Sequence, residues 1–331
     1  MAKIVLGMAS SHAPQLEMPP DKWLEYAKGA FTMPAHWYQG KTFTYEELLE
    51  TRRDAHFERE VSPEKFQARW DACQRAIAHL GETLDRVAPD VCILLGDDQH
   101  EAFHDDNMPS IAIYNGATVD DAPAAAGHRA NLSDAAVANW PDGRVTHPTD
   151  PGLGQYLIEA LIEEEFDVAR SNSMPKGTRD GTIGHAFYYV YRRLMNNEVI
   201  PNVPIMVNTY YPPNAPTAKR SYKFGQALRR AVEAWDTDKR VAIIASGGLS
   251  HTVIEEDLDA RIIDGLKHND VEKLIDYPDV RFRAGTSEIK NWIILAGAMA
   301  GDGLQCNMVD YVPCYRTDAG NGCAMGFAEW L

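Results

Sequence analysis

The sequence predicts an α/β fold: a single domain over residues 1–331 with a central mixed sheet, flanking helices and an aromatic-rich insertion. Short continuous apolar runs, which are typical of strands buried on both faces, recur along the chain. Amphipathic helical periods separate these runs, and this alternation is typical of a sheet covered on two sides. With 45% hydrophobic residues, the chain can bury a sizeable core.

Five apolar runs are predicted to form strands of this sheet. They comprise residues 3–8, 90–95, 110–114, 203–208 and 240–246. Apolar side chains also recur at steps of three and four from Phe66 to Val87, which predicts a helix that ends before Pro89. Residues 153–165 and 224–235 show the same period and are also expected to be helical.

Residues from about 17 to 60 interrupt this alternation with an insertion rich in aromatic side chains. These are Trp23, Tyr26, Phe31, Trp37, Tyr38, Phe43 and Tyr45. One interpretation is a loop that packs on the domain surface. The other is a lid over a site at the strand ends, because long loops often carry function. A lid is the expected role of this insertion.

Charge and cysteine content exclude several classes of protein. Lys and Arg total 32 against 48 Asp and Glu, so the formal net charge is −16. This charge repels nucleic-acid phosphates and anionic membranes and argues against both as partners. Five cysteines without a CxxC pair argue against a disulfide framework or a structural zinc site. We find no signal peptide and no apolar run of about 18 residues, so the cytoplasm is the expected location.

Three histidines occupy the same position relative to a predicted strand. His12 follows the first strand, His100 follows the second, and His251 follows the fifth. In an open α/β sheet, ligands bind outside the carboxyl ends of the strands. If these strands are parallel neighbours, all three imidazoles converge on one crevice. A single histidine is more often a core residue, but three at strand ends predict a shared site.

Glu288 is the candidate anionic ligand for a metal at this site. Thr286 or Ser287 can cap the apolar helix that follows and place Glu288 in its first turn. The helix dipole alone also favours an acid there, which is the simpler interpretation. Two neutral imidazoles and one carboxylate leave coordination positions open, which suits a non-haem Fe(II) oxygenase. The same ligands suit catalytic zinc, and spacing alone does not separate the two metals.

Six segments form a pattern that is specific when they are taken together. In chain order they are SSHAP (10–14), DDQHEAF (97–103), NTYYPP (208–213), SGGLSH (246–251), EIKNW (288–292) and AGNG (319–322). The pattern resembles the type II extradiol dioxygenases, the superfamily of the protocatechuate 4,5-dioxygenase catalytic subunit. It is most similar to the gallate and 3-O-methylgallate dioxygenases, and the similarity runs from residue 4 to about residue 328.

The resemblance implies a non-haem Fe(II) enzyme that cleaves a catechol-type aromatic acid with O₂, next to the ring hydroxyls. The acid would be of the 3-O-methylgallate, gallate or protocatechuate class, and the process would be aromatic-compound catabolism, including lignin-derived aromatics. His12 and His100 are then the expected iron ligands, with Glu288 as the third. His251 is the expected catalytic acid/base. His185, which is otherwise a packing residue at a helix start, is the second expected catalytic histidine.

A ring carboxylate requires local hydrogen-bond donors or cations in this acidic chain. The candidate substrate-binding residues are Tyr210, Tyr211, Lys219, Arg220 and Asn321. The alternative for Lys219 and Arg220 is an ordinary solvated helix start. The expected partners are a small aromatic diol, O₂ and a second copy of the chain, because the aromatic insertion would suit a homodimer surface.

Three other functions stay open from the residues alone. A zinc hydrolase could use the same two histidines and glutamate. A non-catalytic binding member of the fold is a second alternative, although such a protein does not need all four candidate site residues. The third is an extradiol enzyme for another diol, such as an aminophenol or homoprotocatechuate.

Overall fold

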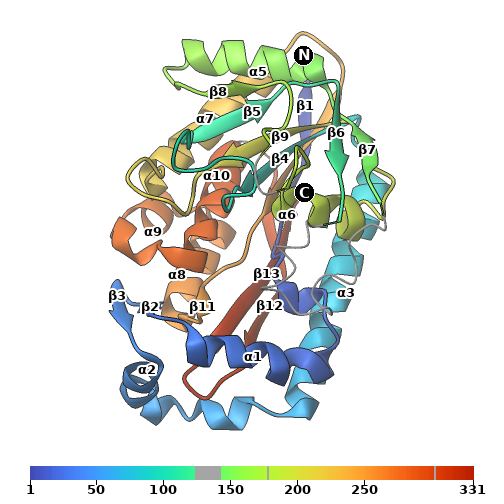
Figure 1. Ribbon diagram of the computed structural model, residues 1–331. Helices are drawn as coiled ribbons and strands as arrows, with labels where there is room; N and C mark the ends of the chain where they lie inside the picture. The colour runs from blue at the N-terminus through green and yellow to red at the C-terminus, as the bar shows by residue number, and fades with distance from the viewer. Residues whose placement is uncertain (124–142, 177–178, 302) are drawn as a thin grey trace.

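The computed structural model describes residues 1–123, 143–176, 179–301 and 303–331 (Figure 1). Its strands, in chain order, are β1 (Lys3–Ser10), β2 (His36–Tyr38), β3 (Lys41–Phe43), β4 (Val91–Asp97), β5 (Ile111–Tyr114), β6 (Thr118–Asp121), β7 (Val145–Pro148), β8 (Ala169–Ser171), β9 (Asn202–Val207), β10 (Arg240–Ser246), β11 (His251–Val253), β12 (Cys306–Tyr315) and β13 (Asn321–Trp330).

The helices differ widely in length. The α-helices are α1 (Trp23–Thr32), α2 (Tyr45–Thr51), α3 (Pro63–Val87), α5 (Pro151–Glu163), α6 (His185–Tyr189), α7 (Ala218–Ala234), α8 (Glu256–His268), α9 (Val271–Ile275) and α10 (Ile289–Met299). The short helical turns are η1 (Pro14–Leu16), η2 (Pro20–Lys22), η3 (Arg53–Ala55), η4 (Phe57–Glu60), η5 (Val190–Leu194), η6 (Asp279–Arg281) and η7 (Ala284–Glu288). Within the four described ranges, no helix combines the length and the apolar character that crossing a membrane requires.

The main sheet is mixed, as predicted. Its strands in the described residues follow the order β11-β13-β1-β10-β4-β9-β5-β8, and β12 also pairs with β13. The central pairs β1–β10, β10–β4 and β4–β9 are parallel. In contrast, β13 runs antiparallel to β1, and β5 runs antiparallel to β9. The α/β class with a central mixed sheet is therefore confirmed.

Alternate residues of the central strands divide the core into two layers. In β4, Ile93 and Leu95 belong to the layer formed with α5, α7 and α10. Cys92 and Leu94 belong to the layer formed with α3 and α6. This division follows from the two-residue period of a strand. Because both faces are covered, the strand is a continuous apolar run.

All five predicted strands and all three predicted helices are present. The long helix α3 begins where Ser62 accepts a hydrogen bond from the backbone N of Lys65, with Pro63 in its first turn. It ends at Ala88, whose φ of 47° is left-handed, directly before Pro89. The predicted end before Pro89 is thus confirmed, and the helix begins at Pro63, before the apolar period that starts at Phe66.

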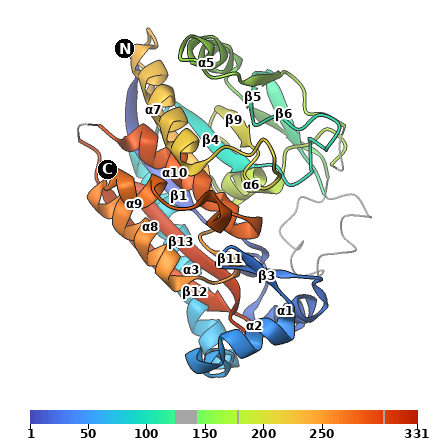
Figure 2. The ribbon, with the colours of Figure 1, turned by 90° about the vertical axis from the view of Figure 1, so that its left-hand side faces the viewer.

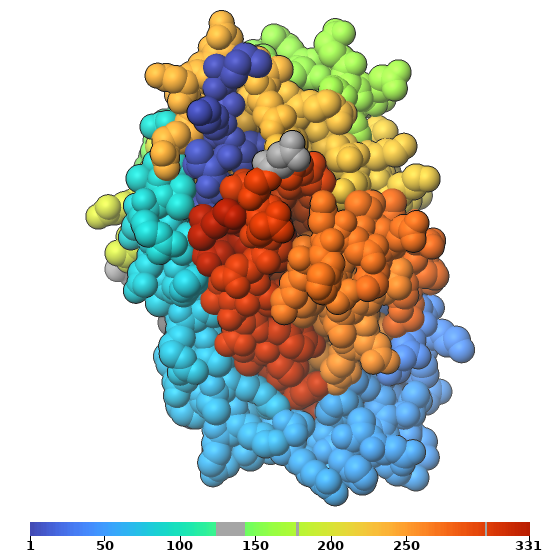
Figure 3. All heavy atoms as spheres, turned by 180° about the vertical axis from the view of Figure 1, so that it is seen from behind, coloured from blue at the N-terminus to red at the C-terminus, as the bar shows by residue number. Residues whose placement is uncertain are grey.

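The C-terminal hairpin of β12 and β13 was not predicted. Every residue of β13 is buried, and small residues such as Gly322 and Gly326 replace the branched side chains that usually identify a strand. A Cβ on Gly322 would lie 2.3 Å from the carbonyl oxygen of Cys314, so the two strands need a glycine at this close approach. Figure 3 shows the hairpin region in red between α3 (cyan) and α8 (orange).

The aromatic insertion folds into α1, α2 and the small β2–β3 sheet below the main sheet (Figures 1 and 2). Arg52 anchors the insertion to the rest of the domain, because its guanidinium donates to the carbonyl oxygens of Ile254, Ala319 and Gly320. The insertion also contributes Tyr26 to the wall of the cavity described below. Movement of this segment as a lid stays a prediction.

Helices α7 and α10 pack closely against each other beside the sheet (Figure 2), and Gly225 makes this approach possible. A Cβ on Gly225 would lie 1.9 Å from the carbonyl oxygen of Ile294. Gly225→Ala is therefore expected to lower the free energy of unfolding by about 1–3 kcal/mol, since an overpacked core must shift. Denaturant unfolding measures this change. The control is Gly29→Ala in α1, where a Cβ meets nothing within 4 Å. That variant should be neutral or more stable by up to about 1 kcal/mol, and an equal loss in both variants would contradict the packing argument.

Candidate active site

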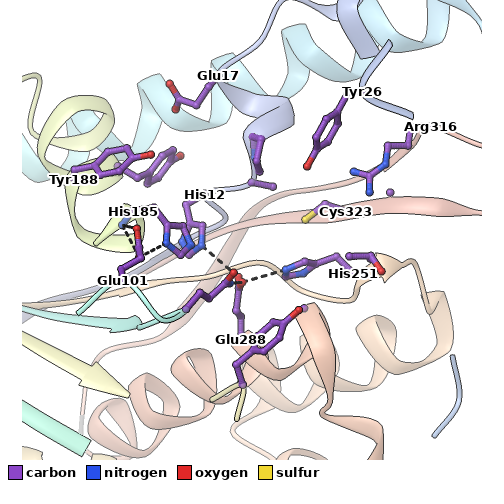
Figure 4. Close-up of a pocket in the computed structure, with 18 residues that line it drawn as sticks. His12, Glu17, Tyr26, Glu101, His185, Tyr188, His251, Glu288, Arg316 and Cys323 are labelled. Atoms are coloured by element: carbon purple, nitrogen blue, oxygen red, sulfur yellow. Dashed lines mark hydrogen bonds and ion pairs between the residues drawn. The ribbon is translucent and has the colours of Figure 1, made fainter. Parts of the chain in front are cut away.

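The strands β1, β10 and β4 bring polar side chains to one crevice at their carboxyl ends (Figure 4). A cavity of about 300 Å³ opens there, a volume that suits a small molecule. His12 follows β1, and His251 begins the strand that follows β10. Both histidines line the cavity, as does Glu288. The condition that these three strands are parallel neighbours is therefore met.

His12 is buried between two sets of partners. Its Nδ1 lies 2.9 Å from Ser246 Oγ at the end of β10. Its Nε2 faces two carboxylates, 3.5 Å from Glu288 Oε2 and 3.9 Å from Asp97 Oδ1. Burial lowers the pKa of His12 to about 3, although Glu288 opposes this shift. The ring is therefore neutral, which is the form of imidazole that binds metals.

Glu288 is buried directly before α10. A short helical turn, η7, leads into the helix, and neither Thr286 nor Ser287 caps α10, contrary to expectation. Glu288 Oε2 accepts a hydrogen bond of 2.7 Å from the backbone N of Gly248. Burial raises the pKa of Glu288, but His251 and then His12 outweigh burial and leave that pKa below its usual value. The side chain is thus a carboxylate held beside two imidazoles.

The two ring nitrogens of His251 face different partners. Nδ1 donates to the carbonyl oxygen of Leu249 at 2.8 Å, and Nε2 lies 3.1 Å from Glu288 Oε1. Because a carbonyl and a carboxylate can only accept, both nitrogens carry a proton in this arrangement; burial lowers the pKa of His251, but Glu288 outweighs burial and raises that pKa well above its usual value. A Cβ on Gly285 would lie 2.2 Å from the His251 ring, and a Cβ on Gly248 would lie 2.8 Å from it. The two glycines therefore leave room for this ring.

The half-buried His185 forms an ion pair with the buried Glu101. Its Nδ1 lies 2.6 Å from Glu101 Oε2, and its backbone N donates to the same carboxylate at 3.0 Å. Burial lowers the pKa of His185, but Glu101 outweighs burial and raises it to about 10. The ring meets that of His12 edge to face, with centroids 4.6 Å apart. His185 thus presents a charged ring beside the neutral ring of His12 (Figure 4).

The residues present fit a divalent metal. One ligand atom from each of His12, Asp97, His185 and Glu288 lies within 4.8 Å of the other three. His12, Asp97 and Glu288 are buried, and their nitrogen and oxygen donors at this spacing suit a first-row metal ion. Asp97 Oδ1 is buried without a hydrogen-bond partner in the described part of the chain, so a cation would satisfy it. The amide of Gln99 donates to Asp97 Oδ2 at 2.9 Å and to Glu288 Oε1 at 3.1 Å.

His100 lies away from this group of residues. Its backbone φ of 58° is left-handed. Its ring stacks on that of Tyr211, with centroids 3.7 Å apart and planes 3° apart, and its Nε2 lies 3.2 Å from Asp105 Oδ1. The structure therefore brings together His12 and Glu288, but not His100, of the three expected ligands. The neighbouring Gln99 lines the cavity in its place.

Of the five expected substrate-binding residues, Tyr210 lines the cavity. Tyr211 contacts His100 instead. Lys219 and Arg220 are exposed in the first turn of α7, where the Arg220 guanidinium lies 4.0 Å from the centroid of the Phe166 ring. Asn321 is buried, and its side chain bonds to His36 and Thr317. None of these last four residues is among the side chains that line the cavity in the described structure.

Several polar residues at the site were missed from the sequence, and four of them belong to its charged and amide groups. They are Asp97, Gln99, Glu101 and Arg316. The first three belong to the polar run that begins at Asp97, the last residue of the otherwise apolar strand β4, and that run was a signal that could have identified them. Arg316 follows β12 directly. Because the C-terminal hairpin was not predicted, nothing in the sequence placed Arg316 near the site.

Comparisons with known proteins agree with this geometry. Residues 60–321 match the family described as the catalytic LigB subunit of aromatic ring-opening dioxygenase. The chain is 31% identical over 176 residues to a gallate dioxygenase of Pseudomonas putida, covering 49% of each chain. It is 27% identical over 179 residues to a 2,3-dihydroxyphenylpropionate/2,3-dihydroxicinnamic acid 1,2-dioxygenase of Photorhabdus laumondii, covering 54% of this chain and 48% of the relative. A Rhodococcus protein of the same name is 28% identical over 236 residues, covering 66% of each. The chain thus spans about half to two thirds of the length of these relatives.

Proposed function

Because this chain belongs to the family of the catalytic LigB subunit of aromatic ring-opening dioxygenases, we propose that it is an extradiol dioxygenase. It would use O₂ to open the ring of a catechol-type aromatic acid beside the two hydroxyls. Both oxygen atoms would enter the product. The relatives named for gallate and for dihydroxyphenylpropionate support a diol that carries a carboxylate.

One observation carries this proposal. Three histidines and a carboxylate converge on a single small cavity at the carboxyl ends of parallel strands, namely His12, His185, His251 and Glu288. A scaffold without chemistry would gain nothing from burying them there, since buried ionisable groups cost free energy unless they are paired. Their placement at one cavity supports a catalytic role over a binding role.

We propose that His12 and Glu288 hold Fe(II) and that Asp97 is the third ligand. The geometry favours Asp97 over His100, because Asp97 lies within the group of donor atoms and the ring of His100 is stacked on Tyr211. Ser246 orients the His12 ring through Nδ1, so that Nε2 faces the metal position. When bound, a redox-active metal supplies the position at which the diol and O₂ meet and exchange electrons.

The other two histidines would handle protons and charge. If a bound metal drew the charge of Glu288 away from Nε2, His251 would accept a proton from a diol hydroxyl at that atom, since Nδ1 is fixed on the carbonyl of Leu249. It can later return that proton to the reacting oxygen. His185, held charged by Glu101, would donate a hydrogen bond to negative charge that develops beside His12. The Tyr210 side chain would help exclude water from the ring, because it lines the same cavity.

The proposed function predicts O₂ uptake when Fe(II)-loaded protein, prepared without O₂, meets the right diol. The test panel is protocatechuate, gallate, 3-O-methylgallate, catechol and homoprotocatechuate. Uptake of one O₂ for each molecule whose aromatic absorbance disappears is the expected result with at least one of them. The control is the same protein loaded with Zn²⁺, which should take up none. No uptake on any diol, together with zinc in protein purified as expressed, would reject the dioxygenase in favour of a hydrolase.

A further inference from the structure

We propose that Arg316 binds the carboxylate of the ring substrate and so sets the preference of the enzyme for aromatic acids over neutral diols. This inference rests on the proposed function, since it assigns the substrate-recognition group of the same cavity. Arg316 lines the cavity together with Tyr26, His251 and Cys323. It lies directly after β12, on a segment that the expected substrate-binding residues do not include.

Arg316 is a buried cation without a counter-ion. The residue is 8% exposed. No carboxylate of the described residues lies within 4.0 Å of its guanidinium, and its Nε is buried without a hydrogen-bond partner. Burying an unpaired charge is costly, and a native protein usually compensates it with a partner. An anion that enters the cavity would provide that partner.

The guanidinium is held in place by neutral groups. Nη1 donates to Gln15 Oε1 at 3.2 Å. Gln15 is itself fully buried and oriented, because its Nε2 donates to the carbonyl oxygen of Cys314 at 3.3 Å. The guanidinium also lies over the ring of Tyr26, 4.5 Å from the ring centroid. These contacts fix the arginine without neutralising it, which leaves its charge for a ligand.

Other cations near the cavity are already paired. His185 is neutralised by Glu101 at 2.6 Å. Arg193 lies 3.0 Å from Glu17, whose side chain lines the same cavity. Among the described residues that line the cavity, Arg316 is therefore the cation suited to an incoming carboxylate. Its planar guanidinium can bind a carboxylate through two hydrogen bonds.

The position of Arg316 suits a ring that spans the cavity. Figure 4 shows Arg316 and Tyr26 on one side, with Cys323 and His251 between them and Glu288. A planar diol acid can place its hydroxyls at the end occupied by His12 and Glu288 and its carboxylate at the other end. Lys219 and Arg220, the cations expected from the sequence, lie outside the cavity lining.

The test compares binding of matched acids and neutral diols in the absence of O₂. The pairs are gallate with pyrogallol, protocatechuate with catechol, and 3-(2,3-dihydroxyphenyl)propionate with 3-methylcatechol. Calorimetric titration of the Fe(II)-loaded protein measures each Kd without turnover. The wild type should bind at least one acid about 10- to 100-fold more tightly than its neutral counterpart, which is the effect of a charge-assisted hydrogen bond. Arg316→Gln should abolish that preference while the Kd of the neutral diol stays within about threefold.

Two further variants keep the result interpretable. Arg316→Lys keeps the charge but loses the planar guanidinium. It should therefore retain part of the preference for acids over neutral diols, even if Arg316→Gln folds poorly. Arg220→Gln removes a cation outside the cavity and should leave every Kd unchanged. A wild type that prefers none of the three acids overturns the proposal, and so does an unchanged preference in both Arg316 variants. Failure of the proposed function would instead appear as an intact acid preference without O₂ uptake.

Discussion

Replacing His12 by Ala or Glu288 by Gln is expected to remove the bound metal and to lower turnover by about three orders of magnitude or more. Each change deletes a ligand from the buried group that faces the cavity. The loss of metal should dominate because Asp97 is already one of the proposed ligands and the charged His185 cannot replace the lost one. Asp97 shares the Gln99 amide with Glu288, and His185 is paired with Glu101. Metal content after anaerobic loading with Fe(II) and the rate of O₂ uptake measure the two effects.

His100→Ala is the matched control, since it removes a histidine that the family resemblance predicted to be an iron ligand. The ring of His100 stacks on Tyr211, so this variant should keep its metal and most of its turnover.

Asp97→Asn keeps the shape of the proposed third ligand and removes its charge. It should weaken metal binding about 10- to 100-fold or more. Metal lost from His100→Ala and retained in Asp97→Asn would reverse the ligand assignment.

The main architecture could be predicted because the central strands and helices carry strong local signals. β4 is a continuous apolar run, and α3 has both a proline start and a proline stop. The positions of His12 and His251 followed from the same signals, because both lie shortly after strands that proved to be parallel neighbours. Glu288 could be proposed as well, although its helix begins one or two residues later than a cap at Ser287 or Thr286 would place it.

The direction of side chains in a turn could not be predicted. Gln99 and His100 are consecutive, and which of them faces the cavity depends on the left-handed backbone of His100. Side chains of adjacent residues in an extended chain point to opposite sides. Assigning a ligand one position too far along the chain therefore selects a side chain that points away from the site. Arg316 shows a second limit, because its place depends on the pairing of β12 with β13 over the whole sheet edge.

His251→Phe or His251→Ala is expected to keep the metal and lower turnover by about 10²- to 10⁴-fold, the usual contribution of a general acid/base. The metal should stay because Glu288 remains held by the backbone N of Gly248 and the amide of Gln99. Turnover should fall because Nε2 of His251 is the nitrogen that can exchange a proton beside the diol. Metal analysis and steady-state O₂ uptake across a range of pH test both parts.

The pH profile separates a proton-transfer role from a packing role for His251. Removing a titrating group should flatten the limb of the pH–rate profile that this group controls, whereas a packing defect should lower the rate at every pH alike. His268→Ala changes an exposed histidine on α8 and should leave the rate and the profile unchanged. Phe preserves the ring volume between Gly248 and Gly285. A His251→Phe protein that has lost its metal would therefore contradict the acid/base assignment. It would instead make His251 a residue that holds Glu288 in place. Because the cavity wall is kept in that variant, a slow but metal-bound enzyme can be attributed to the missing proton exchange.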